Sequence, residues 1–376
     1  MQHVYIGLMS GTSLDGVDGV LAEFGVDASI GLKVWAHCHE PYSPGLAAEL
    51  LALNSPGENE LHRAAIAGNA IAAQYGAVVE SLLHRTGIPR RRVRAIGAHG
   101  QTVRHRPGEF DGVGYTLQLL SPALLAESTA VPVVADFRSR DVAAGGQGAP
   151  LVPSFHRAVF GRTGEPLAVV NIGGFSNLTA IGVDGSMHGL DCGPGNVLLD
   201  HWCSIHTGKP FDEAGRWSAS GTVIEQLLQD MLDDAFFALP APKSTGRDRF
   251  NPEWLAMQLR HCPAAVGARP EDVQCTLVEL TARTSAAQVL RYAVEATELL
   301  VCGGGALNRY LLQRLSSALP GVRVLATDAL GLPCTQVEAC AFAWLARAHI
   351  EGQPANVSEV TGARGPRLLG ALYPAG

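Results

Sequence analysis

The residues with the clearest potential for chemistry lie near the start of the chain, in Leu8–Val20, which reads LMSGTSLDGVDGV. Apolar runs flank this segment, which predicts a strand, a tight turn and a second strand. Gly11 and Gly16 are expected to give the turn backbone angles that other residues avoid. Backbone N–H groups and the hydroxyls of Thr12 and Ser13 would then form a cradle for an anion such as phosphate.

Two carboxylates in the same segment, Asp15 and Asp18, would repel a phosphate directly. They fit the site if a divalent cation such as Mg²⁺ lies between carboxylate and phosphate, bound directly or through water. The combination therefore predicts a magnesium-nucleotide site. The alternative is an ordinary hairpin turn, in which Gly, Ser, Thr and Asp are common for local reasons.

A second segment repeats this arrangement. Leu167–Ile172 is expected to be a strand, residues 173–177 (GGFSN) a Gly/Ser turn, and strands expected at Leu178–Val183 and Met187–Leu190 lead to Asp191. This weak internal repeat indicates two halves that open with the same device. A hairpin from each half could hold a phosphate chain from both sides.

Three further glycines, Gly303–Gly305, follow a strand expected at Glu298–Cys302 and precede a helix expected at Asn308–Leu319. Glycines in this position allow a nucleotide to approach the backbone, and a helix N-terminus favours negative charge. The run does not match the dinucleotide-binding pattern G-x-G-x-x-G. A tight packing corner is the alternative.

The elements that must position these residues alternate between strand and helix, which predicts an α/β protein. In the first half, a long helix is expected at Glu60–Thr86 and a strand at Val93–Ala98 that ends at His99. The Gly- and charge-rich stretch Asp136–Pro150 is expected to be a hinge loop without regular structure. A last helix is expected at Thr335–Ile350.

Composition limits the classes of function. A chain of 376 residues is long for one core and predicts two domains. The net charge of −7 argues against a nucleic-acid partner, and no stretch approaches the roughly 20 apolar residues that span a membrane. Eight scattered cysteines without zinc-ligand spacing, and an N-terminus without a basic leader, indicate a cytoplasmic protein with reduced thiols.

The chain contains no P-loop, G-x-S-x-G or H-E-x-x-H motif. Its two phosphate hairpins, glycine corner and hinge loop instead resemble the superfamily shared by hexose kinases, actin and heat-shock ATPases. Within that superfamily the chain resembles the 1,6-anhydro-N-acetylmuramic acid kinases. Five segments carry this resemblance: MSGTSLDGVD at 9–18, HGQT at 99–102, AAGGQGAP at 143–150, NIGGFSNLT at 171–179 and DCGPGN at 191–196.

The resemblance implies a duplicated, actin-like (ribonuclease H-like) α/β kinase of two domains with a cleft between them. The expected domains are residues 1–138, with 352–376 docked on them, and residues 139–351. The family uses ATP and Mg²⁺, opens the anhydro-sugar with water and phosphorylates it to N-acetylmuramic acid 6-phosphate in peptidoglycan recycling. The resemblance thus implies a small-molecule sugar substrate and a homodimer.

The resemblance also implies that Asp191 activates the attacking water. Many superfamily members carry an Asp two residues before the first glycine of each hairpin, where this chain has Met9 and Asn171, so the base must come from elsewhere. Water attacking an anomeric carbon needs a proton acceptor, and a carboxylate fills that role in inverting glycosidases. The alternative is that Asp191 caps a helix beginning near Asn196.

Other assignments follow the motifs. His99 and Gln101 are expected to line the sugar pocket, Arg138 or Arg140 to bind the lactyl carboxylate, and Glu338 to contact sugar hydroxyls or assist the water. Structural ion pairs or solvated side chains are the alternatives. The residues expected to bind ATP are Gly11, Thr12, Ser13, Leu14, Asp15, Gly16, Val17, Asp18, Gly173, Gly174, Ser176, Asn177, Gly303, Gly304, Gly305 and Asn308, with Asp15 and Asp18 also expected at the metal.

Two alternative functions remain open at this point. One is an ordinary sugar or acid kinase of the same fold that acts on a free hydroxyl. The other is a nucleotide-dependent switch protein that hydrolyses ATP slowly and ignores sugar.

Overall fold

The chain divides into two compact units, unit 1 with residues 1–159 and 336–376, and unit 2 with residues 160–335. The structure is a computed structural model that describes residues 3–25, 31–247 and 249–376. Residues 139–159 and helix α12 (Val337–Ile350), which the expected limits assign to the second domain, belong to unit 1 by their contacts, because α12 packs on the first sheet.

Unit 1 is built on a six-stranded sheet in the order β13-β7-β4-β1-β2-β3. β1 and β2 pair antiparallel, as the predicted strand–turn–strand implies, and β3 pairs antiparallel with β2, whereas β4 runs parallel to β1 and β7 parallel to β4. β13 closes the edge antiparallel to β7. The strands are β1 (Val4–Met9), β2 (Gly16–Phe24), β3 (Leu32–Pro41), β4 (Val93–Ala98), β7 (Val133–Ala135) and β13 (Ala371–Tyr373).

Unit 2 contains a five-stranded sheet in the order β10-β9-β8-β11-β12. β8, β9 and β10 form an antiparallel meander, and β11 and β12 continue parallel to β8. This order is that of unit 1 without β13, so the topology confirms the predicted internal repeat. The strands are β8 (Leu167–Ile172), β9 (Phe175–Ile181), β10 (Met187–Pro194), β11 (Glu298–Cys302) and β12 (Arg323–Ala326).

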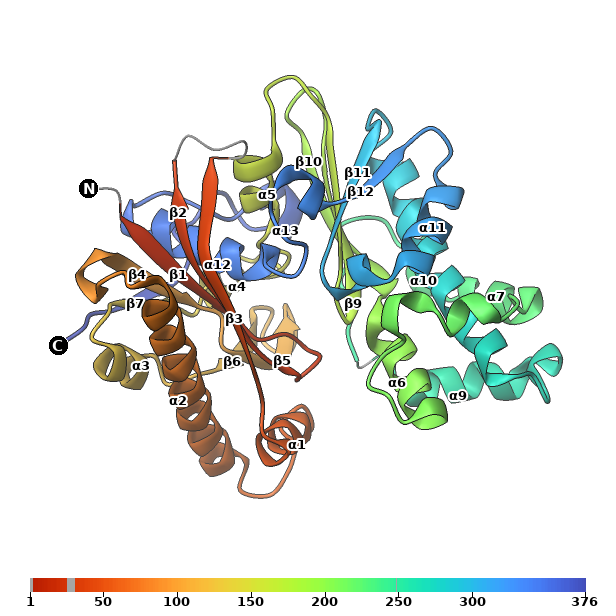
Figure 1. Cartoon of the computed structure of the whole chain (residues 1–376), viewed down its shortest axis with the longest axis horizontal. Helices are drawn as coiled ribbons and strands as arrows, with labels where there is room; N and C mark the ends of the chain where they lie inside the picture. Colours follow the sequence, from red (N-terminus) through yellow and green to blue (C-terminus); the bar gives the residue numbers. More distant parts are fainter. Residues whose placement is uncertain (1–2, 26–30, 248) are drawn as a thin grey trace. The chain divides into compact units, whose positions relative to one another are not determined.

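Two helices cover opposite faces of the first sheet, as Figure 1 shows. α12 lies so close to the strands that a Cβ at Gly7 would stand 1.8 Å from the carbonyl oxygen of Ala339. Gly7 pairs in register with Gly97 of β4, which has the same contact with Phe342. On the other face, α2 (Glu60–Thr86) packs on β2 and β3 through a helical stripe that includes Tyr75. Small residues therefore set the distance between sheet and helix on the α12 face.

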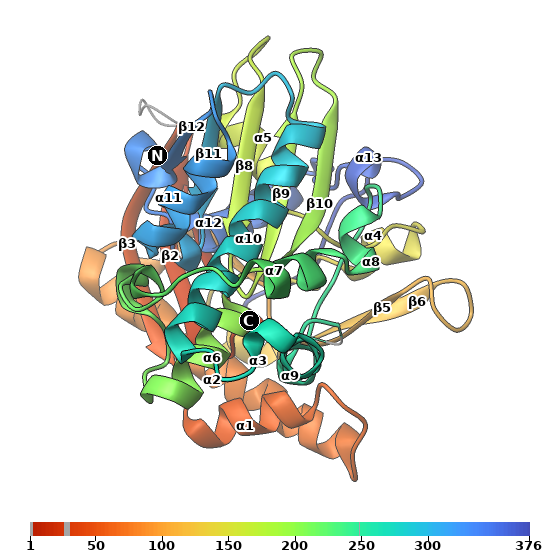
Figure 2. The same ribbon diagram turned by 90° about the vertical axis from the view of Figure 1, so that its right-hand side faces the viewer.

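The remaining helices complete the two units. Figure 2 shows α10 lying over the strands of the second sheet, where it contacts β9 and β10. Within the described ranges, no helix is long and apolar enough to cross a membrane, and all eight cysteines are buried free thiols. These helices are α1 (Pro44–Ala52), α3 (Pro122–Thr129), α4 (Ser139–Ala143), α5 (Pro153–Phe160), α6 (Asn196–Thr207), α7 (Glu225–Leu232), α8 (Ala235–Ala238), α9 (Pro252–His261), α10 (Pro270–Tyr292), α11 (Arg309–Ala318) and α13 (Ser358–Thr361).

One expectation for unit 1 is wrong. The stretch 136–150 is not irregular throughout, because it contains α4, whose residue Asp141 is fully buried. Tertiary hydrogen bonds to Asp141 from Asn356 and Thr361, rather than sequence periodicity, hold this helix. After β4, strand β5 (Gln101–Pro107) pairs with β6 (Gly114–Leu119) in a separate two-stranded sheet.

Candidate active site

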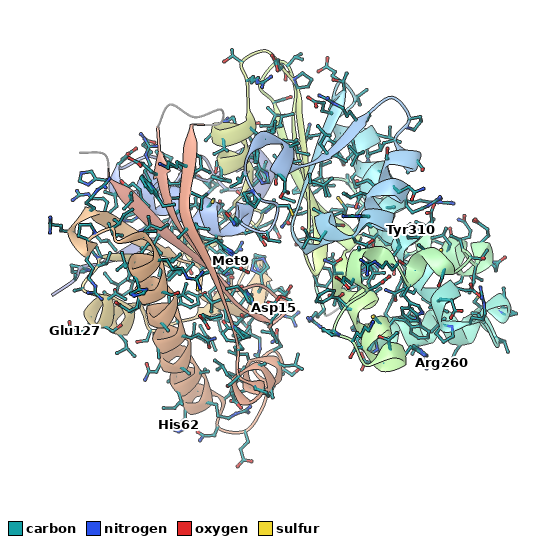
Figure 3. The ribbon with its side chains drawn as sticks, in the orientation of Figure 1. Met9, Asp15, His62, Glu127, Arg260 and Tyr310 are labelled. Atoms are coloured by element: carbon teal, nitrogen blue, oxygen red, sulfur yellow. The ribbon has the colours of Figure 1, made fainter. Side chains whose placement is uncertain are left out.

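The carboxyl ends of β1, β4 and β7 bring two predicted residues of unit 1, His99 and Arg138, together with Ser10 at one end of the sheet, because the strands run parallel. Ser10 follows β1, His99 follows β4, and Arg138 comes shortly after β7. Met9, the last residue of β1, and Asp15 lie at the same end of the sheet (Figure 3). In open α/β sheets, ligands bind at the carboxyl ends of the strands.

The first hairpin turns through Gly11–Leu14, closed by a hydrogen bond from the backbone N–H of Leu14 to the carbonyl of Gly11 at 3.3 Å. Its left-handed residue is Leu14, with φ 59°, whereas Gly11 has no positive φ, so the backbone reason expected for Gly11 is wrong. Gly16 is required by packing, since a Cβ there would lie 2.3 Å from the carbonyl oxygen of Glu40. Val17 is a buried core residue of β2.

Three glycines of the predicted nucleotide-binding motifs, two in the phosphate hairpins and one in the glycine corner, have neither a left-handed backbone nor a crowded environment. A Cβ on Gly11, Gly173 or Gly304 would find its nearest described atom at 3.6, 3.7 or 3.6 Å respectively. Protein packing therefore does not explain glycine at these positions. Because packing does not require glycine here, the lack of a side chain is better explained by a ligand that approaches the backbone.

The two carboxylates of the first hairpin have different surroundings. Asp15 is exposed and accepts a hydrogen bond from the Ser13 hydroxyl at 2.7 Å. Asp18 lies on β2, and one of its oxygens accepts hydrogen bonds from His37 at 2.9 Å and His39 at 3.3 Å. In the described part of the chain, no three His, Cys, Asp or Glu residues form a metal-binding group. The carboxylates and exposed hydroxyls are hard oxygen donors, which suit a Mg²⁺ that keeps several waters.

The buried His99 pairs with the half-buried Arg138 next to this hairpin. The Nδ1–H of His99 donates to the carbonyl of Ser10 at 3.3 Å, and its Nε2 accepts from Nε and Nη2 of Arg138 at 3.1 and 2.9 Å. Burial, and then the Arg138 charge, lowers the pKa of His99 to about 3. His99 is therefore a neutral imidazole with a fixed tautomer. Gln101 lies at the same end of the strands, and its Nε2 donates a hydrogen bond to the carbonyl of Gly11 at 3.0 Å.

Glu338 lies in the first turn of α12 and is half-buried. One turn later in the same helix, the Phe342 ring contacts the ring of His99, with centroids 4.7 Å apart, and that of Phe137 at 5.5 Å. The beginning of α12 therefore lies near His99, at the carboxyl end of β4. Arg140 is exposed on α4.

In unit 2 the second hairpin is joined to the start of α6. The carbonyl of Gly174 accepts from the N–H groups of Gly195 and Val197 at 2.9 and 3.1 Å, and that of Gly173 from Asn196 at 2.8 Å. These bonds satisfy amides that a helix N-terminus leaves unpaired. A Cβ on Gly195 would lie 2.4 Å from the carbonyl oxygen of Gly173, so this glycine is needed for the junction.

Ser176, expected to contact ATP, is fully buried, and its hydroxyl bonds with the carbonyl of Gly193 at 3.4 Å and the Ser285 hydroxyl at 3.3 Å. Asn177 stands in the middle of a polar row. It pairs in register with Asn171 on β8 and with Asp191 on β10, so the three side chains share one face. The Oδ1 atom of Asn171 is buried and accepts no hydrogen bond from any described residue.

Asp191 lies at an irregularity of β10. The register with β9 shifts between Asp191 and Gly193, so Cys192 is an extra residue of a β-bulge. Bulges are frequent beside active sites because they re-aim side chains. Gly195 is the N-cap residue of α6, and the N–H groups of Asn196 and Val197 at the start of that helix donate to carbonyls of the second hairpin.

A loop that the sequence analysis overlooked holds Asp191 from two sides. The backbone N–H of Thr245 donates to Oδ2 of Asp191 at 2.9 Å, and the N–H of Asp191 donates to the carbonyl of Lys243 at 3.0 Å. The Lys243 ammonium is buried and donates to the carbonyls of Phe236 and Phe237 at 3.1 and 3.3 Å. Burial lowers the pKa of Lys243, opposed by the charge of Asp191. A Lys and a Thr in a loop without a motif gave no local signal.

The glycine corner is partly a packing feature. Gly303 has φ 81°, and a Cβ there would lie 2.4 Å from Oδ1 of Asn171. Gly305 is crowded by Ile172 at 2.4 Å. Gly304 and Gly305 lie in a 3₁₀ turn, Gly304–Leu307, that precedes α11 (Arg309–Ala318), and α11 has bounds close to those predicted. Asn308 instead caps α11, its Oδ1 accepting from the N–H of Leu311 at 2.9 Å.

A sequence model of the family described as anhydro-N-acetylmuramic acid kinase matches residues 3–375. The chain is 58% identical to the anhydro-N-acetylmuramic acid kinase of Variovorax paradoxus, with 99% of both chains covered. It is 54% identical to that of Albidiferax ferrireducens, with both chains covered in full. The chain belongs to the anhydro-N-acetylmuramic acid kinase family. Its enzyme class is therefore that of a kinase, as the resemblance implied.

Among solved structures, the activator of 2-hydroxyisocaproyl-CoA dehydratase from Clostridium difficile, with bound ADPNP, resembles this family member in fold. The TM-score is 0.50 at 12% identity, with 93% of this chain and 96% of that chain covered. At such low identity the similarity concerns the fold alone. With the repeated sheet order of units 1 and 2, the predicted α/β class of a duplicated, actin-like kinase is confirmed.

Proposed function

We propose that the protein phosphorylates 1,6-anhydro-N-acetylmuramic acid with ATP while water opens the anhydro bridge, giving N-acetylmuramic acid 6-phosphate and ADP. The observation that carries this proposal is the setting of Asp191. It immediately precedes the bulge in β10, accepts the Thr245 N–H and shares a sheet face with Asn171 and Asn177. A carboxylate held in this way is suited to orient one water molecule and accept its proton.

The proposed reaction has one continuous electron path. Water attacks C1 of the sugar and its proton passes to the Asp191 carboxylate. The C1–O6 bond breaks, and the electron pair left on O6 attacks the γ-phosphorus of ATP, which releases ADP. No separate acid is needed for O6, because phosphoryl transfer takes up its negative charge.

ATP contacts are proposed for the glycine-bearing turns. A Cβ on Gly11, Gly173 or Gly304 would make only ordinary contacts, so the protein does not crowd their backbone, and Thr12 and Ser13 add exposed hydroxyls. The ADPNP named for the fold neighbour supports nucleotide use by this fold. The remaining predicted ATP residues are proposed to act through their backbone or by holding the turns, since Ser176 and Asn308 already have protein partners.

Mg²⁺ is proposed to accompany the nucleotide, with Asp15 and, through water, Asp18 as the residues that hold it. When bound, it would neutralise charge that accumulates on the phosphates during transfer. The exposed Asp15 is the better placed of the two, because Asp18 is already hydrogen-bonded to two histidines.

The sugar is proposed to contact residues at the strand edge of unit 1. Arg138 would hold the lactyl carboxylate, since a guanidinium suits a carboxylate, while His99 and Gln101 line the pocket and Glu338 contacts hydroxyls. Because the substrate is a product of peptidoglycan turnover and the co-substrate is ATP, we place the enzyme in peptidoglycan recycling in the cytoplasm. A homodimer is also proposed, from family resemblance alone.

The test is mass spectrometry of the product formed from 1,6-anhydro-N-acetylmuramic acid and Mg-ATP in ¹⁸O-water. Label at C1 of a 6-phosphorylated sugar is expected. Phosphorylation that leaves the anhydro bridge intact would indicate an ordinary kinase and leave Asp191 without its water. ADP release that is slow and independent of sugar would favour a switch protein.

A further inference from the structure

A buried carboxylate outside the site links the C-terminal segment to the segment after β7. Asp141 on α4 is 0% exposed. Its Oδ1 accepts hydrogen bonds from Nδ2 of Asn356 and from the Thr361 hydroxyl, both at 2.8 Å. The proposed reaction does not use Asp141, although burial of a carboxylate is costly unless its oxygens are satisfied.

The other oxygen of Asp141 holds a single backbone group. Oδ2 accepts from the N–H of Gly148 at 2.8 Å. Gly148 has φ 65°, a left-handed conformation that favours glycine, and a Cβ there would lie 2.8 Å from Val142. Gly148 is therefore fixed by its own conformation and by the Asp141 carboxylate.

Gly148 in turn holds Arg138. Its carbonyl accepts from Nη1 of Arg138 at 2.8 Å, while Nε and Nη2 donate to the neutral Nε2 of His99. Two acceptors, one from each side, thus set the plane of the guanidinium. His99 is itself held by the Ser10 carbonyl.

Further contacts bind the C-terminal segment to the loop that contains Gly148. The N–H of Gln147 donates to the carbonyl of Thr361 at 2.7 Å, and the N–H of Arg364 to that of Ala144 at 2.9 Å. The segment is therefore part of the support of the loop that contains Gly148.

We propose that Thr361 and Asn356 are positioning residues for Arg138, acting through Asp141 and Gly148. The assignment of Arg138 as the residue that binds the lactyl carboxylate of the sugar rests on the proposed function. Loss of one bond to Asp141 leaves a buried carboxylate under-satisfied, so Gly148 and the guanidinium shift. Binding of the lactyl carboxylate depends on that orientation, whereas nucleotide binding does not.

The experiment compares Thr361→Val, which removes the hydroxyl and keeps the shape, with Thr361→Ser, which keeps the hydroxyl. For Thr361→Val we expect KM for 1,6-anhydro-N-acetylmuramic acid to rise about three- to tenfold, less than for loss of a direct hydrogen bond to a charged group, because Thr361 acts through Asp141 and Gly148. KM for ATP should stay the same. Affinity for the analogue without the lactyl group, 1,6-anhydro-N-acetylglucosamine, should also be unchanged. Thr361→Ser should restore wild-type values.

A double-mutant cycle with Arg138→Met separates positioning from a general structural effect. In the Arg138→Met background, Thr361→Val should cause no further rise in KM. An equal rise in both backgrounds, or an equal loss for both sugars, would overturn the proposal.

A second measurement does not depend on the sugar. The ¹⁵N side-chain resonance of Arg138 Nε, whose proton is bonded to His99, should shift and exchange faster in Thr361→Val and in Asp141→Asn. If Arg138→Met leaves sugar affinity unchanged while these resonances shift, the assigned sugar role fails and the positioning stands. Unchanged resonances would refute the positioning.

Discussion

Asn171 and Asp191 stand on the same face of the second sheet, each paired in register with Asn177 on the strand between them. Asn171 contributes a buried acceptor without a described partner, and Asp191 a carboxylate fixed by a backbone N–H. An acceptor and an oriented carboxylate together fit the proposed role of Asp191 as the base for a single reacting water. In the first sheet the equivalent row is Met9, Asp18 and His39, so the duplicated hairpins carry different chemistry.

Replacing the proposed base should separate binding from turnover. For Asp191→Asn we expect kcat to fall by about 10²- to 10⁴-fold, with Kd for ATP within about twofold of wild type. The carboxamide oxygen can still accept the Thr245 N–H, so the fold is retained. The measurement is steady-state kinetics with calorimetric ATP titration. Asp184→Asn, in the exposed turn before β10, is the matched control and should keep full activity.

The Thr245 contact with Asp191 is made by the backbone and therefore has a specific test. Thr245→Ala keeps the N–H and should leave kcat within about twofold. Thr245→Pro removes the donor, and the loss of a bond to a charged group corresponds to about 1.5–3 kcal/mol, or roughly ten- to a hundredfold in kcat. Circular dichroism checks that both variants fold. Equal activity of the two variants would show that this N–H does not orient the base.

The sequence allowed prediction of elements whose signals are local. Strands such as Val93–Ala98 and Leu167–Ile172 and helix Glu60–Thr86 have the bounds that their periodicity and caps indicate. Helix α4 could not be found in this way, because its Asp141 is stabilised by Asn356 and Thr361, more than 200 residues away.

The site residues, too, could be predicted only where their sequence signals are local. Glycines mark phosphate turns locally, so the motifs around Gly11 and Gly173 were located, although the reason given for Gly11 was wrong. The partners of Asp191 are different, because Thr245 reaches it across 54 residues of sequence through a backbone atom. A backbone donor leaves no trace in residue type, so only the folded chain reveals it.

The two kinds of glycine in the corner after β11 should respond differently to alanine. At Gly304 the added methyl meets no described atom within 3.6 Å, so the free energy of unfolding should change by less than about 0.5 kcal/mol. If a nucleotide approaches this backbone, KM for ATP should rise by about tenfold, equivalent to 1.4 kcal/mol. Gly303→Ala should instead destabilise by about 1–3 kcal/mol, because of its positive φ and the clash with Asn171.

Urea unfolding and ATP kinetics measure these two effects separately. Gly45→Ala, in open space on α1, is the control and should leave KM for ATP unchanged. If Gly304→Ala binds ATP normally, the corner has only a packing role.

Acid should destabilise the protein through its buried histidines. Burial lowers the pKa values of His99 and His156 to about 3, whereas both return toward the ordinary value of 6.5 on unfolding. Between pH 6.5 and 3 the unfolded chain therefore binds more protons, and the free energy of unfolding falls as the pH falls. The slope approaches about 1.4 kcal/mol per pH unit for each histidine.

Urea titrations at pH 7, 6 and 5 measure this slope. In His99→Asn the slope should be smaller by up to about 1.4 kcal/mol per pH unit, the contribution of one histidine. A slope that His99→Asn leaves intact would mean that His99 does not need to be neutral in the folded protein.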